Sequence, residues 1–373
     1  MRITDKSLIV LGVIALILIV STMFNYSPKK AETGFQKGSD LIKDIDINKI
    51  AKIKIISDVG SLNVKKDKDG YVIEERSNYP ADVKQMNDLI INTIDIKCNK
   101  LVTSLESNYA ALGVDEKSSD TVKLIFLDDQ DKELVNLLVG KREEKGTGAY
   151  VRKAGEKEVY ATEKFYFVSP EAYTYLDKKV FKFTMKDIAK IDVNNGTDKY
   201  SIINDNTEIK LQNVPKSKQA KVPEVQAAFN ALTQLNFEDV AAKESKKDLK
   251  WTTSYVCSLS NGLTYTADLA KEGDDAYYIK VSAEAKEVKK EEPKKEETKE
   301  EAKKDEGKKE ESKEKAAPSP DTFKSFNEKH SQWVYKVGKY TADNMSKSFS
   351  GMIEDIPAKT PEKKAEVTTE VKK

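Results

Sequence analysis

An internal repeat constrains the fold of this chain more than any other feature. The segment Ile-Ala-Lys-Ile-Lys-Ile at residues 50–55 returns as Ile-Ala-Lys-Ile-Asp-Val at residues 188–193. In each half an apolar helix is predicted to follow, beginning near Pro80 or Pro223, and a Tyr-rich strand comes later. A period of about 140 residues is too long for a solenoid unit and fits a duplicated domain.

The two predicted helices carry apolar residues at steps of three and four, the spacing of one helix face. These residues are Val83, Met86, Leu89, Ile90 and Ile94 in the first half, and Val225, Ala228, Phe229, Leu232 and Leu235 in the second. Each helix therefore has one face that can cover a sheet.

Alternating apolar residues bounded by turn signals predict antiparallel hairpins in both halves. Residues 122–127 and 134–139 flank an acidic turn, and Asn261-Gly262 is a strong two-residue hairpin signal. No regular strand–helix–strand alternation appears. The fold class predicted is α+β, with two similar, mostly antiparallel sheet-plus-helix repeats behind one N-terminal transmembrane helix.

The transmembrane prediction rests on an apolar run that begins at Leu8 and ends at Val20. With its flanks the run spans roughly 27 Å as a helix, close to the bilayer core. An uncleaved signal-anchor is favoured over a cleaved signal peptide, because no Ala-x-Ala-like site follows, and over a buried core helix. A short N-terminal tail before a large body predicts a single-pass protein of the bacterial cytoplasmic membrane, with most of the chain extracytoplasmic.

A Lys/Glu-rich tract interrupts the second Tyr hairpin, between the strand at residues 277–281 and the strand at residues 333–335. Such balanced charge cannot bury a core and predicts a disordered insertion. The predicted organisation is a signal-anchor over residues 1–28, a tether over 29–44, repeat 1 over 45–183, repeat 2 over 184–355 with the insertion at 284–322, and a disordered tail over 356–373.

The sequence offers no catalytic constellation. The single histidine, His330, stands at the edge of the predicted insertion, which excludes His-based triads and multi-His metal sites. The glycines between residues 140 and 148 lack the phosphate-loop order, and the acidic turn at residues 128–131 is expected to be an ordinary turn. We therefore predict a protein that is not an enzyme and has no catalytic, cofactor-binding or metal-binding residues.

Charge and cysteine usage narrow the function further. The 64 basic and 63 acidic residues nearly cancel, so no nucleic acid partner is expected. Cys98 and Cys257 have no Cys-x-x-Cys or His neighbour, and two buried thiols are favoured over a disulfide between them. An aromatic run from Tyr160 to Tyr175 suggests a sugar or partner platform, although core packing is the expectation at these spacings.

Several short motifs occur in one order: Tyr-Pro-Ala-Asp at residues 79–82, Tyr-Ala-Ala-Leu-Gly-Val-Asp at 109–115, Leu-Val-Gly-Lys at 138–141, Gly-Ala-Tyr-Val-Arg at 148–152 and Val-Tyr at 159–160. This order resembles the bacterial domain-of-unknown-function family 4340 over about residues 45–195, and more loosely beyond. The second motif departs from the family's Tyr-Gly-Leu-Asp. The resemblance implies a single-pass envelope protein accessory to ABC-transporter subunits like those of gliding-motility systems, and it transfers no catalytic residue.

The residues thus predict a membrane-anchored extracytoplasmic binding or scaffolding protein, and the resemblance implies that it is accessory to an ABC-transporter-type complex. Its partners would be the membrane, through the helix from Leu8 to Val20, and transporter subunits. The alternative is a carboxylate-dependent enzyme that processes a cell-envelope polymer. Partner contacts are predicted at equivalent positions of the two Tyr hairpins, namely Tyr150, Arg152, Tyr277 and Lys280.

Overall fold

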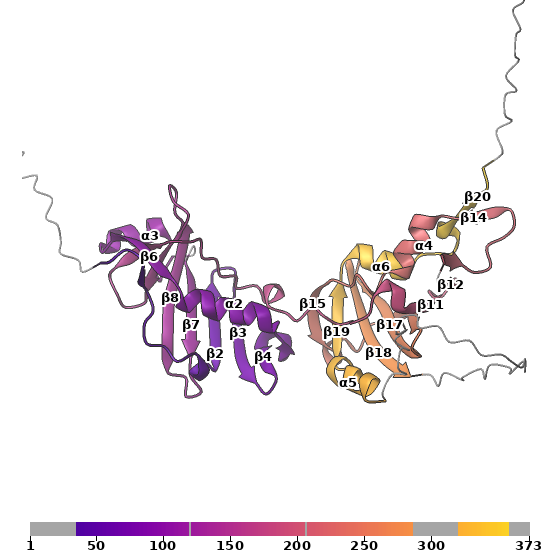
Figure 1. Cartoon of the computed structure of the whole chain (residues 1–373), viewed down its shortest axis with the longest axis horizontal. Helices are drawn as coiled ribbons and strands as arrows, with labels where there is room; N and C mark the ends of the chain where they lie inside the picture. Colours follow the sequence, from indigo (N-terminus) through magenta and orange to yellow (C-terminus); the bar gives the residue numbers. More distant parts are fainter. Residues whose placement is uncertain (1–34, 119–120, 206, 286–319, 358–373) are drawn as a thin grey trace, which may run out of the picture. The chain divides into compact units, whose positions relative to one another are not determined.

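The computed structural model describes residues 35–118, 121–205, 207–285 and 320–357 (Figure 1). These residues divide into two compact units. The first contains the described residues up to 48 together with 90–126 and 133–168, and the second contains 49–89, 127–132 and the described residues from 169 onward. Antiparallel sheets dominate and few helices accompany them, which confirms the α+β class. The predicted anchor, the central part of the predicted insertion and the tail beyond residue 357 lie outside the described residues.

Strands of the first unit follow the order β1-β6-β10-β9-β8-β7. They are β1 (Ser39–Asp40), β6 (Lys97–Thr103), β7 (Val122–Leu127), β8 (Glu133–Arg142), β9 (Ala149–Lys153) and β10 (Val159–Thr162). Helix α3 (Tyr109–Leu112) lies between β6 and β7 in the chain. The predicted Tyr hairpin is confirmed, since β9 pairs antiparallel with β10 across Gly155, whose φ of 78° suits glycine. The first-unit core gathers under this hairpin around Tyr109, Val114, Leu138 and Val159.

The second unit opens with a meander in the order β2-β3-β4-β5. Its elements are β2 (Lys52–Ser57), β3 (Gly60–Asp67), β4 (Gly70–Ile73) and β5 (Tyr79–Pro80), followed by α2 (Val83–Ile94), which continues into the first unit. Strand β2 confirms the strand predicted from the first copy of the repeated segment.

The first long helix does not begin near Pro80, as predicted, because residues 79–80 form the short strand β5 and the helix starts after it. Pro80 lies opposite Val72 in the β4–β5 pair, where an extended backbone suits proline. Helix α2 begins at Val83, because the carboxylate of Asp82 accepts the backbone N–H of Gln85 at 3.0 Å and caps the first turn. Val83 is 54% exposed, so the buried stripe begins at Met86 instead.

An eight-stranded antiparallel sheet forms the rest of the second unit, in the order β13-β12-β11-β16-β17-β18-β19-β15 (Figure 1). Its strands are β11 (Ile188–Asn194), β12 (Lys199–Asn204), β13 (Ile209–Leu211), β15 (Phe237–Ala242), β16 (Trp251–Leu259), β17 (Leu263–Glu272), β18 (Ala276–Ala285) and β19 (Trp333–Val337). The predicted Asn261-Gly262 hairpin is confirmed as β16–β17, with Gly262 at a φ of 90°.

Short elements accompany this sheet. They are α4 (Val222–Phe229), α5 (Pro320–His330), α6 (Lys339–Met345) and the strand pair β14 (Lys218–Ala220) and β20 (Ile353–Asp355). The described residues of the two units also contain short 3-10 turns at Ile47–Lys49, Glu74–Arg76, Glu106–Asn108, Ala172–Thr174, Met185–Asp187, Lys243–Lys246 and Ser350–Met352. As predicted, β19 returns to pair with β18, with Tyr277 opposite Val337. Glu284 and Ala285 belong to β18 and Pro320 begins α5, so described structure reaches into the predicted insertion from both sides.

Helix α5 packs against β18. The Asn327 amide donates to the carbonyl oxygen of Ala283 and accepts the N–H of Ala283, both at 2.8 Å. This two-way bond fixes the helix beside the strand and so positions the residues of its last turn.

Aromatic rings dominate one part of the second-unit core. Tyr79 makes edge-to-face contacts with Phe237, Trp333 and Tyr335 at ring-centroid distances of 6.0, 5.2 and 6.2 Å. Its hydroxyl donates to the carbonyl oxygen of Asp177 at 2.9 Å. Such pairs add stability beyond area burial. Tyr79, the first residue of the Tyr-Pro-Ala-Asp motif, is therefore a core residue.

Within the described ranges, no helix has both the length and the apolar character needed to cross a bilayer.

Candidate functional site

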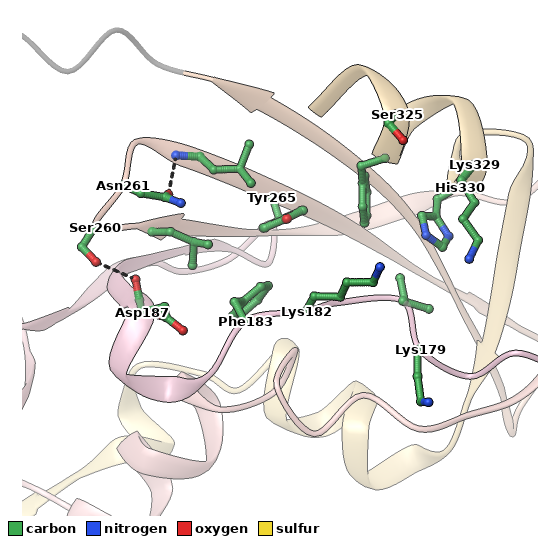
Figure 2. Close-up of a pocket in the computed structure, with 14 residues that line it drawn as sticks. Lys179, Lys182, Phe183, Asp187, Ser260, Asn261, Tyr265, Ser325, Lys329 and His330 are labelled. Atoms are coloured by element: carbon green, nitrogen blue, oxygen red, sulfur yellow. Dashed lines mark hydrogen bonds between the residues drawn. The ribbon is translucent and has the colours of Figure 1, made fainter. Parts of the chain in front are cut away.

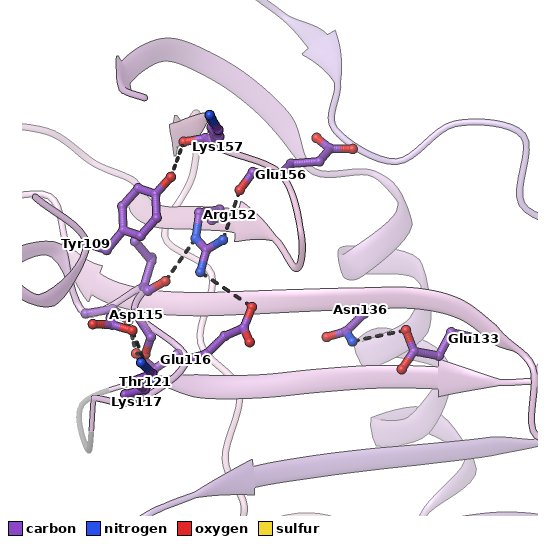
Figure 3. A network of polar contacts seen from close by, with 12 residues as sticks. Tyr109, Asp115, Glu116, Lys117, Thr121, Glu133, Asn136, Arg152, Glu156 and Lys157 are labelled. Carbon is purple, nitrogen blue, oxygen red and sulfur yellow. Dashed lines mark hydrogen bonds and ion pairs between the residues drawn. The ribbon is translucent and has the colours of Figure 1, made fainter. Parts of the chain in front are cut away.

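Arg152, a predicted contact residue, is the centre of a buried polar network in the first unit (Figure 3). Its Nε donates to the carbonyl oxygen of Val114 at 3.0 Å, and one terminal nitrogen donates to the carbonyl oxygen of Glu156 at 2.9 Å. The guanidinium lies 4.3 Å from the centre of the Tyr109 ring, and Arg152 is only 6% exposed. The Arg152 side chain therefore holds the backbone at Val114 and Glu156 in place, and it has little exposed surface with which to contact a partner.

Two glycines let the backbone close around this network. A Cβ on Gly140 would lie 2.3 Å from the carbonyl oxygen of Leu112 and 2.8 Å from that of Gly113. Gly113 ends α3 in the left-handed region, with a φ of 71°. Only glycine fits at position 140, which explains the apolar-Gly-Lys motif by packing.

The other three predicted contact residues are half-buried. Tyr150 packs against the first-unit core beside Tyr109. In the second unit the ammonium of Lys280 lies 4.7 Å from the centre of the Trp251 ring and 3.4 Å from the Asp268 carboxylate, and Lys271 lies over the Tyr277 ring at 5.8 Å. Tyr150, Tyr277 and Lys280 thus each contact another side chain of the same unit, and each keeps part of its surface exposed.

The aromatic run divides between core and surface. Tyr166 is 8% exposed, and its hydroxyl lies 2.5 Å from that of Thr93. Phe165 and Phe167 on either side of it are 49% and 69% exposed, and their rings stack at 6.4 Å. Arg142 lies 5.3 Å from the centre of the Phe165 ring. The pair and Arg142, here called the Phe165–Phe167 patch, form an exposed aromatic and cationic surface in the first unit.

The second unit contains a cavity of about 480 Å³ that the sequence did not predict (Figure 2). Three stretches of chain line it: the segment from Lys179 to Asp187, the β16–β17 turn and the last turns of α5. The lining contains three lysines, Lys179, Lys182 and Lys329, and three aromatic rings, those of Phe183, Tyr265 and Phe326. Because these stretches are distant in sequence, no local motif marks them.

His330, which stands beside the predicted insertion in the sequence, lies in this cavity wall. It ends α5, is 4% exposed, and its Nδ1 lies 2.7 Å from the Tyr335 hydroxyl. Burial first, and then the charge of Lys329, lower the pKa of its imidazole to about 4; Lys182 also lowers it, against an opposing effect of Asp177. The imidazole is therefore neutral at pH 7, and the positive charges of Lys329 and Lys182 favour this neutral form.

Both cysteines are free and buried, as predicted. Burial raises the pKa of Cys98 to about 11 and that of Cys257 to about 12. The acidic turn is closed by its own backbone, since the Asp128 carboxylate accepts the N–H groups of Gln130 and Lys132, both at 2.9 Å. Among the residues with described positions, no cluster of three or more His, Cys, Asp or Glu side chains could hold a metal ion.

The family described as Domain of unknown function (DUF4340) matches residues 72–252, which confirms the resemblance drawn from the short motifs. The match begins in β4 and ends in β16. Both ends lie later in the chain than those of the resemblance drawn from the motifs, which covered about residues 45–195. No curated protein and no solved structure matches the chain.

Proposed function

We propose that this DUF4340-domain chain is a binding or scaffolding protein, anchored in the bacterial cytoplasmic membrane by the helix from Leu8 to Val20. Its body would lie outside the cytoplasm and bind a protein of an ABC-transporter-type complex. The observation that carries the proposal is the Phe165–Phe167 patch. Aromatic residues, phenylalanine included, and arginine are enriched in protein–protein interfaces relative to the rest of the surface.

The roles of the family motifs support binding rather than catalysis. Tyr79 packs in an aromatic core, Asp82 caps α2, Gly140 permits a close backbone approach and Arg152 binds carbonyl oxygens. Each of these four residues thus has a structural role inside the chain. Function is therefore sought at sites outside them.

Strand order supports a duplicated fold as part of the same proposal. In the eight-stranded sheet, β15-β19-β18-β17-β16 has the same succession as β6-β10-β9-β8-β7 of the first unit. The order β11-β12-β13 likewise parallels β2-β3-β4. Duplication would give the scaffold two related surfaces, with Tyr150 on one hairpin and Tyr277 and Lys280 on the other as further contact positions.

Co-purification from membranes tests this function. The double variant Phe165→Ser/Phe167→Ser should lose a co-purifying membrane protein, while Tyr340→Ser, which alters a 71% exposed ring of the second unit, should retain it. Equal recovery with both variants would remove the patch from the proposal. A C-terminal reporter active only in the cytoplasm would contradict the topology, and release of sugars from envelope polymer by the purified chain would favour the enzyme alternative.

A further inference from the structure

The cavity of the second unit combines three features that usually meet in ligand sites. It has a volume of about 480 Å³, which lies within the range of small-molecule pockets. Its walls present rings from Phe183, Tyr265 and Phe326, and its rim carries hydroxyl and amide groups of Ser260, Asn261 and Ser325.

Charge in the cavity favours an anion. Three lysines and one aspartate, Asp187, line it. The Asp187 carboxylate already accepts the backbone N–H and the hydroxyl of Thr184, both at 2.9 Å. Lys329 is 3.0 Å from Asp177, so one of the lysine charges is partly neutralised. The remaining balance is positive.

Figure 2 shows how these charges are directed. Lys182 and Lys329 extend toward the region below the His330 ring, whereas Lys179 points away from it. The imidazole of His330 is 96% buried in the folded chain, yet it lines the cavity and is held by Tyr335 at its Nδ1. A nearly buried polar ring thus faces a cavity between two ammonium groups.

The aromatic wall is preformed. Tyr265 stacks on Phe183 at 5.2 Å and meets Phe326 edge-on at 4.9 Å, so the rings hold one another in place. Phe183 and Phe326 are half-buried and keep part of their surface for a ligand. Flat C–H-rich faces, such as those of sugar rings, pack well on aromatic rings, and hydroxyl groups suit a polar rim.

We propose that this cavity binds an acidic sugar, with its anionic group between Lys182 and Lys329, its ring against Phe183 and Phe326, and its hydroxyls at the rim. The anionic group is a carboxylate or a phosphate, which the lysines would recognise alike. This inference does not rest on the membrane or transporter role proposed above. Failure of one leaves the other intact.

The only histidine of the chain reports on this site directly. In the full-length chain purified in mild detergent and labelled with 13C-histidine, the imidazole signal belongs to His330 alone. Glucuronate and glucose 6-phosphate are the two probes, and glucose and inorganic phosphate are the matched controls for ring and charge. Binding of an acidic sugar should shift the His330 signal, and an anion nearby should raise the imidazole pKa. Whichever probe binds more tightly identifies the anionic group.

Substitutions of lysines inside and outside the cavity test whether binding depends on the cavity or on general surface charge. Lys182 is exposed, so Lys182→Met should fold normally, and it should weaken binding about tenfold because a charge-assisted contact is lost. Lys182→Glu should abolish binding. Lys324→Met removes an exposed lysine of helix α5 that does not line the cavity, and it should bind like the native chain.

Three results would overturn the inference: no shift of the His330 signal with either acidic sugar at millimolar concentration, equal binding by Lys182→Met and Lys324→Met, or a shift reproduced in full by inorganic phosphate. The last result would mean that the lysines attract any anion and that the aromatic wall recognises nothing.

Discussion

The Nε of Arg152 donates a hydrogen bond to the carbonyl oxygen of Val114 at 3.0 Å, and this bond joins two motifs that lie far apart in the sequence. Arg152 belongs to the Tyr-Val-Arg strand β9, and Val114 to the turn after α3. Two of the short motifs of this chain are thus connected through one buried guanidinium.

Replacing Arg152 by methionine should destabilise the first unit by about 2–3 kcal/mol, because buried carbonyl oxygens would lose charged donors. The melting temperature should fall by about 5–10 °C in calorimetry. Arg152→Lys should be intermediate, since an ammonium cannot reproduce the fork of the guanidinium. Arg142→Met, at an exposed arginine, serves as the control, and an equal melting temperature for all of these variants would contradict the structural role.

A second prediction compares a closely packed glycine, Gly140, with an exposed turn glycine, Gly155. Gly140→Ala should cost about 3 kcal/mol, because the new methyl would collide with the carbonyl oxygens of Leu112 and Gly113 and the backbone would have to move. Gly155→Ala should cost only about 1 kcal/mol, since its site is open and only the positive φ opposes a side chain. Urea unfolding followed by circular dichroism measures both. The reverse order of the two costs would mean that the close approach at Gly140 is not rigid.

Local patterns were sufficient to predict much of the sheet structure. The alternation around Asn261-Gly262 and the glycine at position 155 led to the right hairpins, because turn chemistry and period-two patterns depend on neighbouring residues alone. Proline was misleading at position 80, where tertiary pairing with β4 overrides its preference for a helix start. The pairing of β14 with β20 joins residues far apart in the chain and left no local signal.

The candidate site was harder to predict for the same reason. Arg152 was selected as a contact residue because its hairpin resembles that of Tyr277, but its burial is set by Tyr109 and Val114, which come from another element. His330 follows the charged tract and stands at the edge of the predicted insertion. Its imidazole contacts Phe326, one turn earlier on α5, and Tyr335 of β19. Its burial was not predicted because it depends on the packing of α5 against β18, which local sequence does not reveal.

Thiol reactivity gives a third prediction. The thiolate is the reactive form, and burial raises the pKa of both Cys98 and Cys257. An alkylating reagent at pH 8 should therefore label neither residue in the folded chain and both after denaturation, as read by intact mass. Mobility on a non-reducing gel should match that of the reduced chain. Rapid labelling of Cys98 in the folded chain would show that β6 opens locally.

The last prediction concerns the pH dependence of the second unit. The pKa of the His330 imidazole is lowered from 6.5 to about 4, so between these values the unfolded chain binds a proton that the folded chain does not. The contribution to stability is complete above pH 6.5 and is lost as the pH falls toward 4.

Between pH 7 and pH 5 this single group should remove about 2 kcal/mol from the free energy of unfolding. Both tryptophans of the chain, Trp251 and Trp333, lie in the second unit, so their fluorescence during urea unfolding reports on the part that contains His330. His330→Phe should be less stable at pH 7, because the buried Tyr335 hydroxyl loses its hydrogen bond to the imidazole, but its stability should decline less between pH 7 and pH 5. Titrating carboxylates affect both proteins alike and cancel in the comparison. Parallel losses in the native chain and the variant would mean that His330 is not buried in its neutral form, and the same histidine would then be a poor reporter for the cavity.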